Sequence, residues 1–346
     1  MTSPRLFLFL SVFGAIHALY AQEDISFELE YTTEVQTYFD GKYNWVNLLS
    51  LSAGLPSEKI SERWTKGNFQ ITLISVYRNK QRKGDDLMTF SNIDEENVRI
   101  NPFMLGYTHQ WEKVSLFGGV RNVNNDYFTM PYTSLFTNSS AGIFPTIANN
   151  FEMANYPLSA ICLHFEYQPT PMWLFKSSLY NGVAHDPREN VFRSFVVNPR
   201  SDGFTSISEL IFSQNKLGSG RYVLGINLTG NDQFLWTSWL EVEQALYRAG
   251  EKEIGCLFHA RIAPQHALNC HCYCACGGYA ANLTGQNDKL GVYMNWATFA
   301  DVKERTVEIT WQYPALKWLD VQPTLHYIVT GGQTSVIGLF RVIVNI

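Results

Sequence analysis

Four cysteines occupy alternate positions in one short stretch, and cysteine thiolates are common ligands of structural zinc. They are Cys270, Cys272, Cys274 and Cys276. Alternate residues of an extended strand share a face and lie about 6.5 to 7 Å apart. A tetrahedral zinc, with bonds of about 2.3 Å to sulfur, needs its ligands closer than that, and the same spacing strains a disulfide. We interpret the cysteines as small apolar strand residues; a metal or redox role, with Cys256 reaching one of them across a hairpin, is the alternative.

Recognisable catalytic chemistry is missing from the sequence. It contains no Gly-x-Ser-x-Gly elbow, no Walker loop and no His-Glu-x-x-His. Carboxylate pairs such as Glu241 and Glu243 are what the polar face of any strand supplies. We therefore expect that the protein is not an enzyme and uses neither a cofactor nor a metal.

Most other polar side chains alternate with apolar ones, most clearly in 304–313 and 317–329. In the first run Val307 and Ile309 share one face, whereas Glu308 and Thr310 share the other. A period of two predicts β-strands, and we expect a hairpin that turns at 314–316. Aromatic side chains crowd the ends of the apolar face, which favours a wall with lipid on one side and water on the other.

The same reasoning predicts about sixteen strands, an even number within the range of bacterial outer-membrane barrels. Their expected ranges are 25–38, 43–52, 69–78, 98–111, 113–121, 157–168, 172–180, 204–213, 220–229, 236–247, 253–263, 270–281, 289–300, 304–313, 317–329 and 335–346.

The connections between these strands indicate an up-and-down barrel with both termini in the periplasm. The long polar connections, 79–97, 122–156 and 181–203, are all odd-numbered, and several even-numbered ones are tight. Long outer loops and short periplasmic turns are typical of such barrels. The even-numbered connection 53–68 is too long for this rule.

The first and last strands both carry an apolar face and can pair to close the barrel. A two-sheet sandwich is the alternative.

Composition and the N-terminus place the chain outside the cytoplasm. Residues 1–21 combine Arg5, an apolar run and small residues at Ala18 and Ala21, and we expect a cleaved signal peptide followed by a barrel over 22–346. Aromatic residues make up 14% of the chain, but charged residues only 16%, below the roughly 25% of soluble domains. The net charge of −5 argues against nucleic-acid binding.

In a barrel the polar strand faces line a water-filled passage. Hydrogen-bond donors and acceptors from polar side chains, together with the flat apolar rings of aromatic residues, can bind neutral polyhydroxylated solutes. The candidate wall residues are Glu28, Glu30, Glu34, Glu209, Glu243, Glu308, Asp320, Gln322, His326 and Arg341.

The connection 122–156 is rich in Asn, Phe and Tyr and poor in charge. A loop of that length without regular structure is usually functional or disordered. By position it is the third outer loop, and we hypothesise that it narrows the passage; an ordinary surface loop is the alternative. The residues that would form the narrowest section are Arg121, Asn122, Asn124, Asn125, Asp126 and Tyr127.

From about Gly106 onwards the sequence resembles the carbohydrate-selective porin family of the OprB type. The resemblance lies in the order and spacing of segments such as GGVRNVNNDYF (118–128), SLFTNSS (134–140), EVEQALYR (241–248) and the 307–329 hairpin. It implies a sixteen-stranded outer-membrane barrel that passes sugars down their gradient. Glu209, Glu243, Gln244, Glu308 and Gln322 fall on matching family positions.

This resemblance also implies a cellular location and a set of partners. The barrel would lie in the outer membrane of a Gram-negative bacterium, among its lipid and lipopolysaccharide. Its partners would be carbohydrate solutes and the barrel-assembly machinery, and both a monomer and a homotrimer fit. A plugged barrel with an adhesin or structural role and a secreted sugar-binding β-sandwich are the other functions considered.

The cysteine spacing gives a first testable prediction. Metal analysis of the purified, folded protein should show no stoichiometric zinc, because an extended strand keeps the four thiols too far apart for one tetrahedral ion. One zinc per chain, lost when the cysteines are replaced by serine, would contradict this interpretation.

Overall fold

The structure is a computed structural model that describes residues 25–38, 41–80, 86–188, 190–215, 218–230, 233–265 and 268–346. The expected signal peptide, 1–21, lies outside the described residues. Within them, no helix is long and apolar enough to cross a bilayer.

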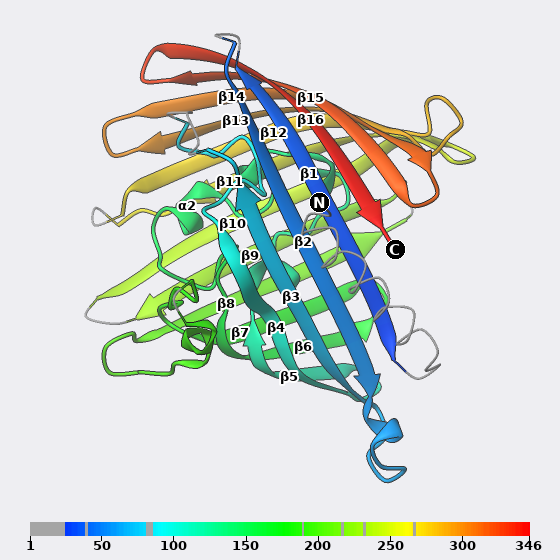
Figure 1. The fold of residues 1–346 in the computed structure, drawn as a ribbon, viewed down its shortest axis with the longest axis vertical. Coiled ribbons are helices and arrows are strands. Elements are labelled where there is room, and N and C mark those ends of the chain that lie inside the picture. Colours follow the sequence, from blue (N-terminus) through cyan, green and yellow to red (C-terminus); the bar gives the residue numbers. More distant parts are fainter. Residues whose placement is uncertain are drawn as a thin grey trace, which may run out of the picture.

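Sixteen antiparallel strands form one closed barrel, in which each strand pairs with its neighbours in sequence and β1 pairs with β16 (Figure 1). The predicted barrel and strand number are confirmed, and the sandwich alternative is wrong. The strands are β1 (Ser26–Tyr38), β2 (Tyr43–Pro56), β3 (Gly67–Arg78), β4 (Val98–Gln110), β5 (Val114–Arg121), β6 (Ala160–Thr170), β7 (Trp173–Asn181), β8 (Phe204–Gln214), β9 (Gly220–Gly230), β10 (Phe234–Ala249), β11 (Lys252–Ile262), β12 (Cys270–Ala281), β13 (Lys289–Phe299), β14 (Lys303–Leu316), β15 (Leu319–Thr330) and β16 (Gln333–Asn345).

Short helical turns interrupt the connections. They are the 3-10 turns η1 (Ser57–Lys59), η2 (Val123–Asn125), η3 (Thr133–Leu135), η4 (Ser139–Ala141) and η5 (Val191–Phe195), and the short helix α2 (Pro145–Ala148). The segment that contains η1 extends beyond the rim of the barrel at the end of β2 (Figure 1).

Backbone pairing at the seam closes the barrel. Leu29 and Ile346 exchange two backbone hydrogen bonds of 2.9 Å, although they lie at opposite ends of the chain. A closed barrel leaves no strand edge unpaired, which is the condition for crossing a membrane with strands.

The side-chain alternation has the expected polarity. On β14, Glu304 and Glu308 are fully buried inside, whereas Ile309 and Trp311 are 47% and 38% exposed outside. Large apolar side chains cover the outer face all around, and many of those near its ends are aromatic, including Tyr43, Trp45, Trp111, Trp173, Phe204, Phe234, Tyr247 and Trp318. An apolar band with aromatic girdles is the surface of a membrane-spanning barrel.

Two expectations about local structure are wrong. The turn between β14 and β15 lies at 317–318 instead of 314–316, because Pro314 remains in the ladder at an irregularity, one of the few places where a strand tolerates proline. The four alternate cysteines do not share one face. A bulge between Cys270 and Cys272 turns Cys270 inward, where it is fully buried.

The three other cysteines of β12 face outward. Cys276 pairs with Phe258 on one side and Met294 on the other, and both partners are more than 40% exposed on the outer face. An extra residue in one strand shifts the alternation by one position, so spacing in the sequence could not show that the bulge separates Cys270 from the others.

The outer face leads to a stability prediction. Ile309→Arg should lower the free energy of unfolding in lipid vesicles by about 2 to 4 kcal/mol, because it places a charge near the middle of the apolar band. Urea titration followed by heat-modifiable gel mobility measures this, with Ile309→Leu as the matched control. Equal stability of the two variants would show that lipid does not cover this face.

Candidate functional site

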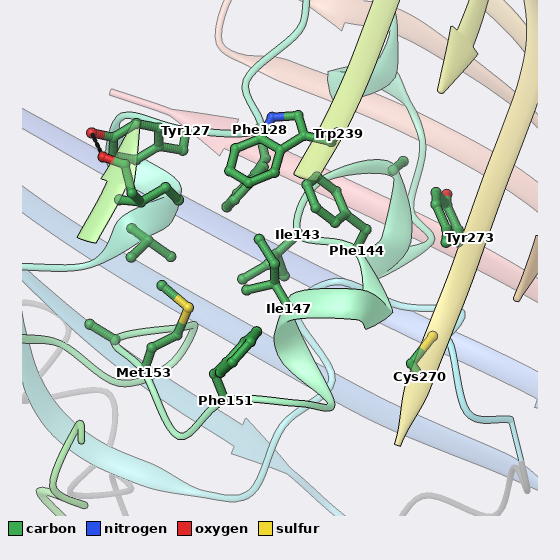
Figure 2. Close-up of a cluster of buried hydrophobic side chains, with 14 of the residues drawn as sticks. Tyr127, Phe128, Ile143, Phe144, Ile147, Phe151, Met153, Trp239, Cys270 and Tyr273 are labelled. Carbon is green, nitrogen blue, oxygen red and sulfur yellow. Dashed lines mark hydrogen bonds between the residues drawn. The ribbon is translucent and has the colours of Figure 1, made fainter. Parts of the chain in front are cut away.

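The third outer connection runs into the barrel. This segment, 122–159, is called here the inserted loop. Its apolar side chains Phe128 and Phe144 pack against Trp239 of β10, with ring centroids 5.5 and 5.3 Å apart (Figure 2). Tyr127, Phe136, Ile147 and Met153 are also buried in this cluster. The surface-loop alternative is therefore wrong, because the loop forms an apolar core inside the wall.

Two glycines on the inner wall make room for loop aromatics. A Cβ at Gly255 of β11 would lie 2.4 Å from the ring of Tyr132, and one at Gly291 of β13 would lie 2.6 Å from the ring of Phe136. Neither distance is possible between real atoms, so any larger side chain at these positions would displace the loop. The rings instead stack on their neighbours, Tyr132 on Tyr279 at 4.3 Å.

Buried carboxylates of the wall bind the backbone of the inserted loop. Glu243 of β10 accepts hydrogen bonds from the backbone N–H groups of Tyr132 and Thr133, at 2.8 Å each. Glu308 of β14 accepts from those of Thr137 and Asn138, at 2.7 and 3.0 Å. Each carboxylate thus satisfies two consecutive donors that have no strand partner, which removes the penalty for burying them.

The third such contact holds a different loop. Glu304 accepts from the backbone N–H groups of Leu87 and Met88, at 2.7 and 2.8 Å. These residues belong to the connection between β3 and β4, which also turns inward, so that Phe90 lies against His326 with ring centroids 5.6 Å apart. The sequence analysis missed this second inward loop; the apolar pair Met88 and Phe90 in a polar connection was the available signal.

Of the predicted site residues, five occupy the inner face and are buried: Glu209, Glu243, Glu308, Gln322 and His326. Gln322 donates to the backbone oxygen of Leu135 at 2.6 Å. His326 Nε2 lies 2.9 Å from the hydroxyl of Thr137. Glu209 accepts from the indole of Trp239 at 3.2 Å. Their partners are the inserted loop and the wall residues beneath it.

One predicted site residue is on the wrong face. Gln244 follows Glu243 directly, and in a strand consecutive side chains point to opposite faces. Its side chain lies among outward residues and accepts hydrogen bonds from the hydroxyl of Tyr222 at 2.5 Å and from Gln214 at 3.3 Å. The expectation that Gln244 lines the passage is therefore wrong.

Charged groups from β5, β6 and β7 gather at the start of the inserted loop, although the loop sequence itself is poor in charge. Arg121 donates to Asp126 at 2.6 Å, and Lys176 of β7 donates to the backbone oxygen of Asp126 at 2.7 Å. Asn122 caps η2 through the N–H of Asn124. Burial raises the pKa of Asp126, and the guanidinium of Arg121 opposes that shift.

Among the described residues, one group has the spacing of metal ligands. Asp126, His164 and Glu166 place one ligand atom each within 4.8 Å of one another. However, Arg121 already binds Asp126, and Lys176 lies 3.7 Å from Glu166. Two cations here would repel a third, so the cluster is better described as an ion-pair network that fixes the loop to β5–β7.

A cavity of about 530 Å³ remains beside the loops. It is lined by residues of β1, β2, β4, β14, β15 and β16 and by both inward loops. Its polar lining includes Glu30, Asn92, Asn124, Asn149, Asn155, Gln312, Asp320 and Arg341, with Phe103 and Tyr156 among its aromatic residues. Asn125 and Asp126, predicted for the narrowest section, do not line this cavity, whereas Asn124 does.

The carboxylate contacts predict a specific loosening of the inserted loop. Glu308→Ala leaves two buried N–H groups without an acceptor, at about 1 to 3 kcal/mol each. Hydrogen exchange of the amides in 132–138 should accelerate, and the single-channel conductance should rise or become noisy. Glu112→Ala, in an exposed turn, is the matched control. Unchanged exchange in Glu308→Ala would show that the contact does not hold the loop.

Comparison with protein-family models and with curated proteins finds no match for this sequence. Solved structures do match. The high-pH structure of OprB from Pseudomonas putida has a TM-score of 0.83 at 14% identity, covering 96% of this chain and 97% of that one. Its low-pH structure gives 0.66, with 96% of each chain covered. The trimer form of OmpT from Vibrio cholerae gives 0.59 at 11% identity, covering 93% and 99%. The chain thus has the sixteen-stranded β-barrel fold of the outer-membrane porins.

Proposed function

We propose that this protein is an outer-membrane porin of a Gram-negative bacterium that lets carbohydrates diffuse through the barrel. The observation that carries the proposal is the cavity beside the inward loops, lined among others by β1, β14, β15 and β16, which we interpret as the passage for solutes. Its lining combines amides and hydroxyls with the rings of Phe103 and Tyr156. The hydroxyl groups of a sugar need hydrogen-bond donors and acceptors, and the apolar face of its ring packs against flat aromatic side chains.

The predicted site residues act in this proposal mainly by shaping the passage. Glu243, Glu308, Gln322 and His326 hold the inserted loop against β10, β14 and β15. Arg121, Asn122 and Asp126 fix its first turn, to which Asn125 belongs, and Glu209 supports the indole of Trp239 beneath it. Direct contact with the solute comes from groups that line the passage, such as Asn124 and Asp320.

The fold of solved porins supports the rest of the proposal. OprB and OmpT are porin-fold barrels of nearly the same extent, and OmpT occurs as a trimer. We propose export by a signal peptide over 1–21 and insertion of 22–346 by the barrel-assembly machinery into a lipid and lipopolysaccharide bilayer. A homotrimer is the proposed assembly. The chemistry is passive diffusion, without catalysis or cofactor.

A plugged barrel with an adhesin or structural role is the second candidate. The apolar core that the inserted loop builds inside the wall favours it, because such a core fills part of the lumen. The two candidates differ in one property, since a plugged barrel folds in the membrane but passes no solute.

Liposome swelling separates the two functions. Vesicles that contain the folded protein should swell in isotonic glucose and maltose at rates that fall with solute size, because the passage is narrow. Heat-modifiable gel mobility confirms that the barrel is folded in the same vesicles. A folded barrel that gives neither swelling nor conductance in planar bilayers would establish the plugged alternative.

A further inference from the structure

The charged groups that line the passage are mostly acidic. Among the residues that the structure describes, the cavity lining contains the carboxylates of Glu30, Asp94, Glu95 and Asp320, but only one cation, Arg341. A neutral sugar does not need such an imbalance, so the source and strength of the negative charge matter.

The single cation in the lining is already neutralised. Arg341 donates to the carboxylate of Glu34 at 2.7 Å and to the amide oxygen of Asn92 at 2.5 Å. Glu34 is fully buried, so this pair contributes little net charge to the passage. Asp94 is balanced in the same way by Arg78, at 3.5 Å.

Glu30 and Asp320 have only uncharged hydrogen-bond partners. Glu30 accepts from the hydroxyl of Thr32 at 3.3 Å, and Asp320 accepts from the amide of Gln312 at 2.7 Å. Neither forms an ion pair within the described part of the chain, and both side chains are partly exposed to the cavity. They come from β1 and β15, the two neighbours of β16, so they flank the wall of the passage.

Two further cations of the inner wall are bound to carboxylates of their own. Arg121 binds Asp126 at 2.6 Å, and Arg261 binds Glu241 at 2.6 Å beneath the inserted loop. The guanidinium of Arg261 is also covered by the ring of Phe144, 3.8 Å away.

We propose that the passage is cation-selective, admitting neutral sugars and cationic amino sugars but rejecting sugars that carry a phosphate or carboxylate. Carboxylates on the wall of a narrow, low-dielectric passage raise the local concentration of cations and exclude anions. The proposal rests on the proposed function, because it needs an open passage, and it adds the charge class of the solutes.

Zero-current potentials in planar bilayers under a KCl gradient test the proposal. The unmodified protein should favour K⁺ over Cl⁻. Glu30→Gln and Asp320→Asn should each lower that permeability ratio about sevenfold, because one unit negative charge about 7 Å from an ion in water favours K⁺ about 2.7-fold and disfavours Cl⁻ by about the same factor. Glu62→Gln, which removes an exposed carboxylate outside the cavity, should leave the ratio unchanged.

Swelling assays supply the solute measurement. Vesicles should swell faster in glucosamine than in glucuronate, with glucose between them, and Asp320→Asn should reduce the difference. A conducting channel that prefers Cl⁻, or whose selectivity neither carboxylate variant changes, overturns the cation selectivity but leaves the porin function standing. A folded barrel without any conductance overturns both. Heat-modifiable mobility of each variant verifies folding before it is compared.

Discussion

Backbone hydrogen bonding imposes the main constraint on this structure. A strand surrounded by lipid has no water to satisfy its N–H and C=O groups, so every strand needs two neighbours and the sheet must close. The pairing of β1 with β16 meets that condition. The same requirement applies inside the barrel, because the inserted loop and the connection between β3 and β4 both bury backbone donors that have no partner in a strand ladder. There the partners are side chains of the wall, and Glu243, Glu304 and Glu308 each take two consecutive N–H groups.

The interior of the barrel is consequently divided into two regions. On one side the loop and the wall form a dry core around Trp239 and Phe144, where glycines such as Gly255 replace larger residues to admit rings. On the other side a polar cavity remains beside β1 and β15. The carboxylates that hold the loops therefore help to set the shape of this cavity, although they are buried and do not line it.

Much of the barrel could be predicted, because each strand and its two faces are determined by residues that are close together in the sequence. Alternation along each strand identified the strands and their faces, and connection lengths identified the topology. The sequence also pointed to the inserted loop, since a long aromatic segment with few charges is unusual on a surface. The same rule of alternation could have excluded Gln244 from the inner face once Glu243 was assigned to it.

What could not be predicted depends on contacts between distant segments. The spacing of the cysteines in the sequence does not predict the bulge beside Cys270. The roles of Glu243 and Glu308 follow from loop N–H groups that approach them only in the folded barrel. A polar residue on an inner face has the same pattern whether water or a buried backbone group contacts it, so the pattern could not distinguish a lining residue from a loop anchor.

The distance in sequence between the inserted loop and its anchors has a consequence for the order of assembly. Tyr132 and Glu243 are 111 residues apart, and Thr137 and Glu308 are 171. The loop emerges from the translocation machinery long before β14 exists beside it, so its final position can form only when the C-terminal strands have joined the barrel. Contacts of such long range form late and slowly in folding. A chain that lacks its last strands would therefore leave the inserted loop without its contact to Glu308, so the loop can take its final position only when the chain is complete.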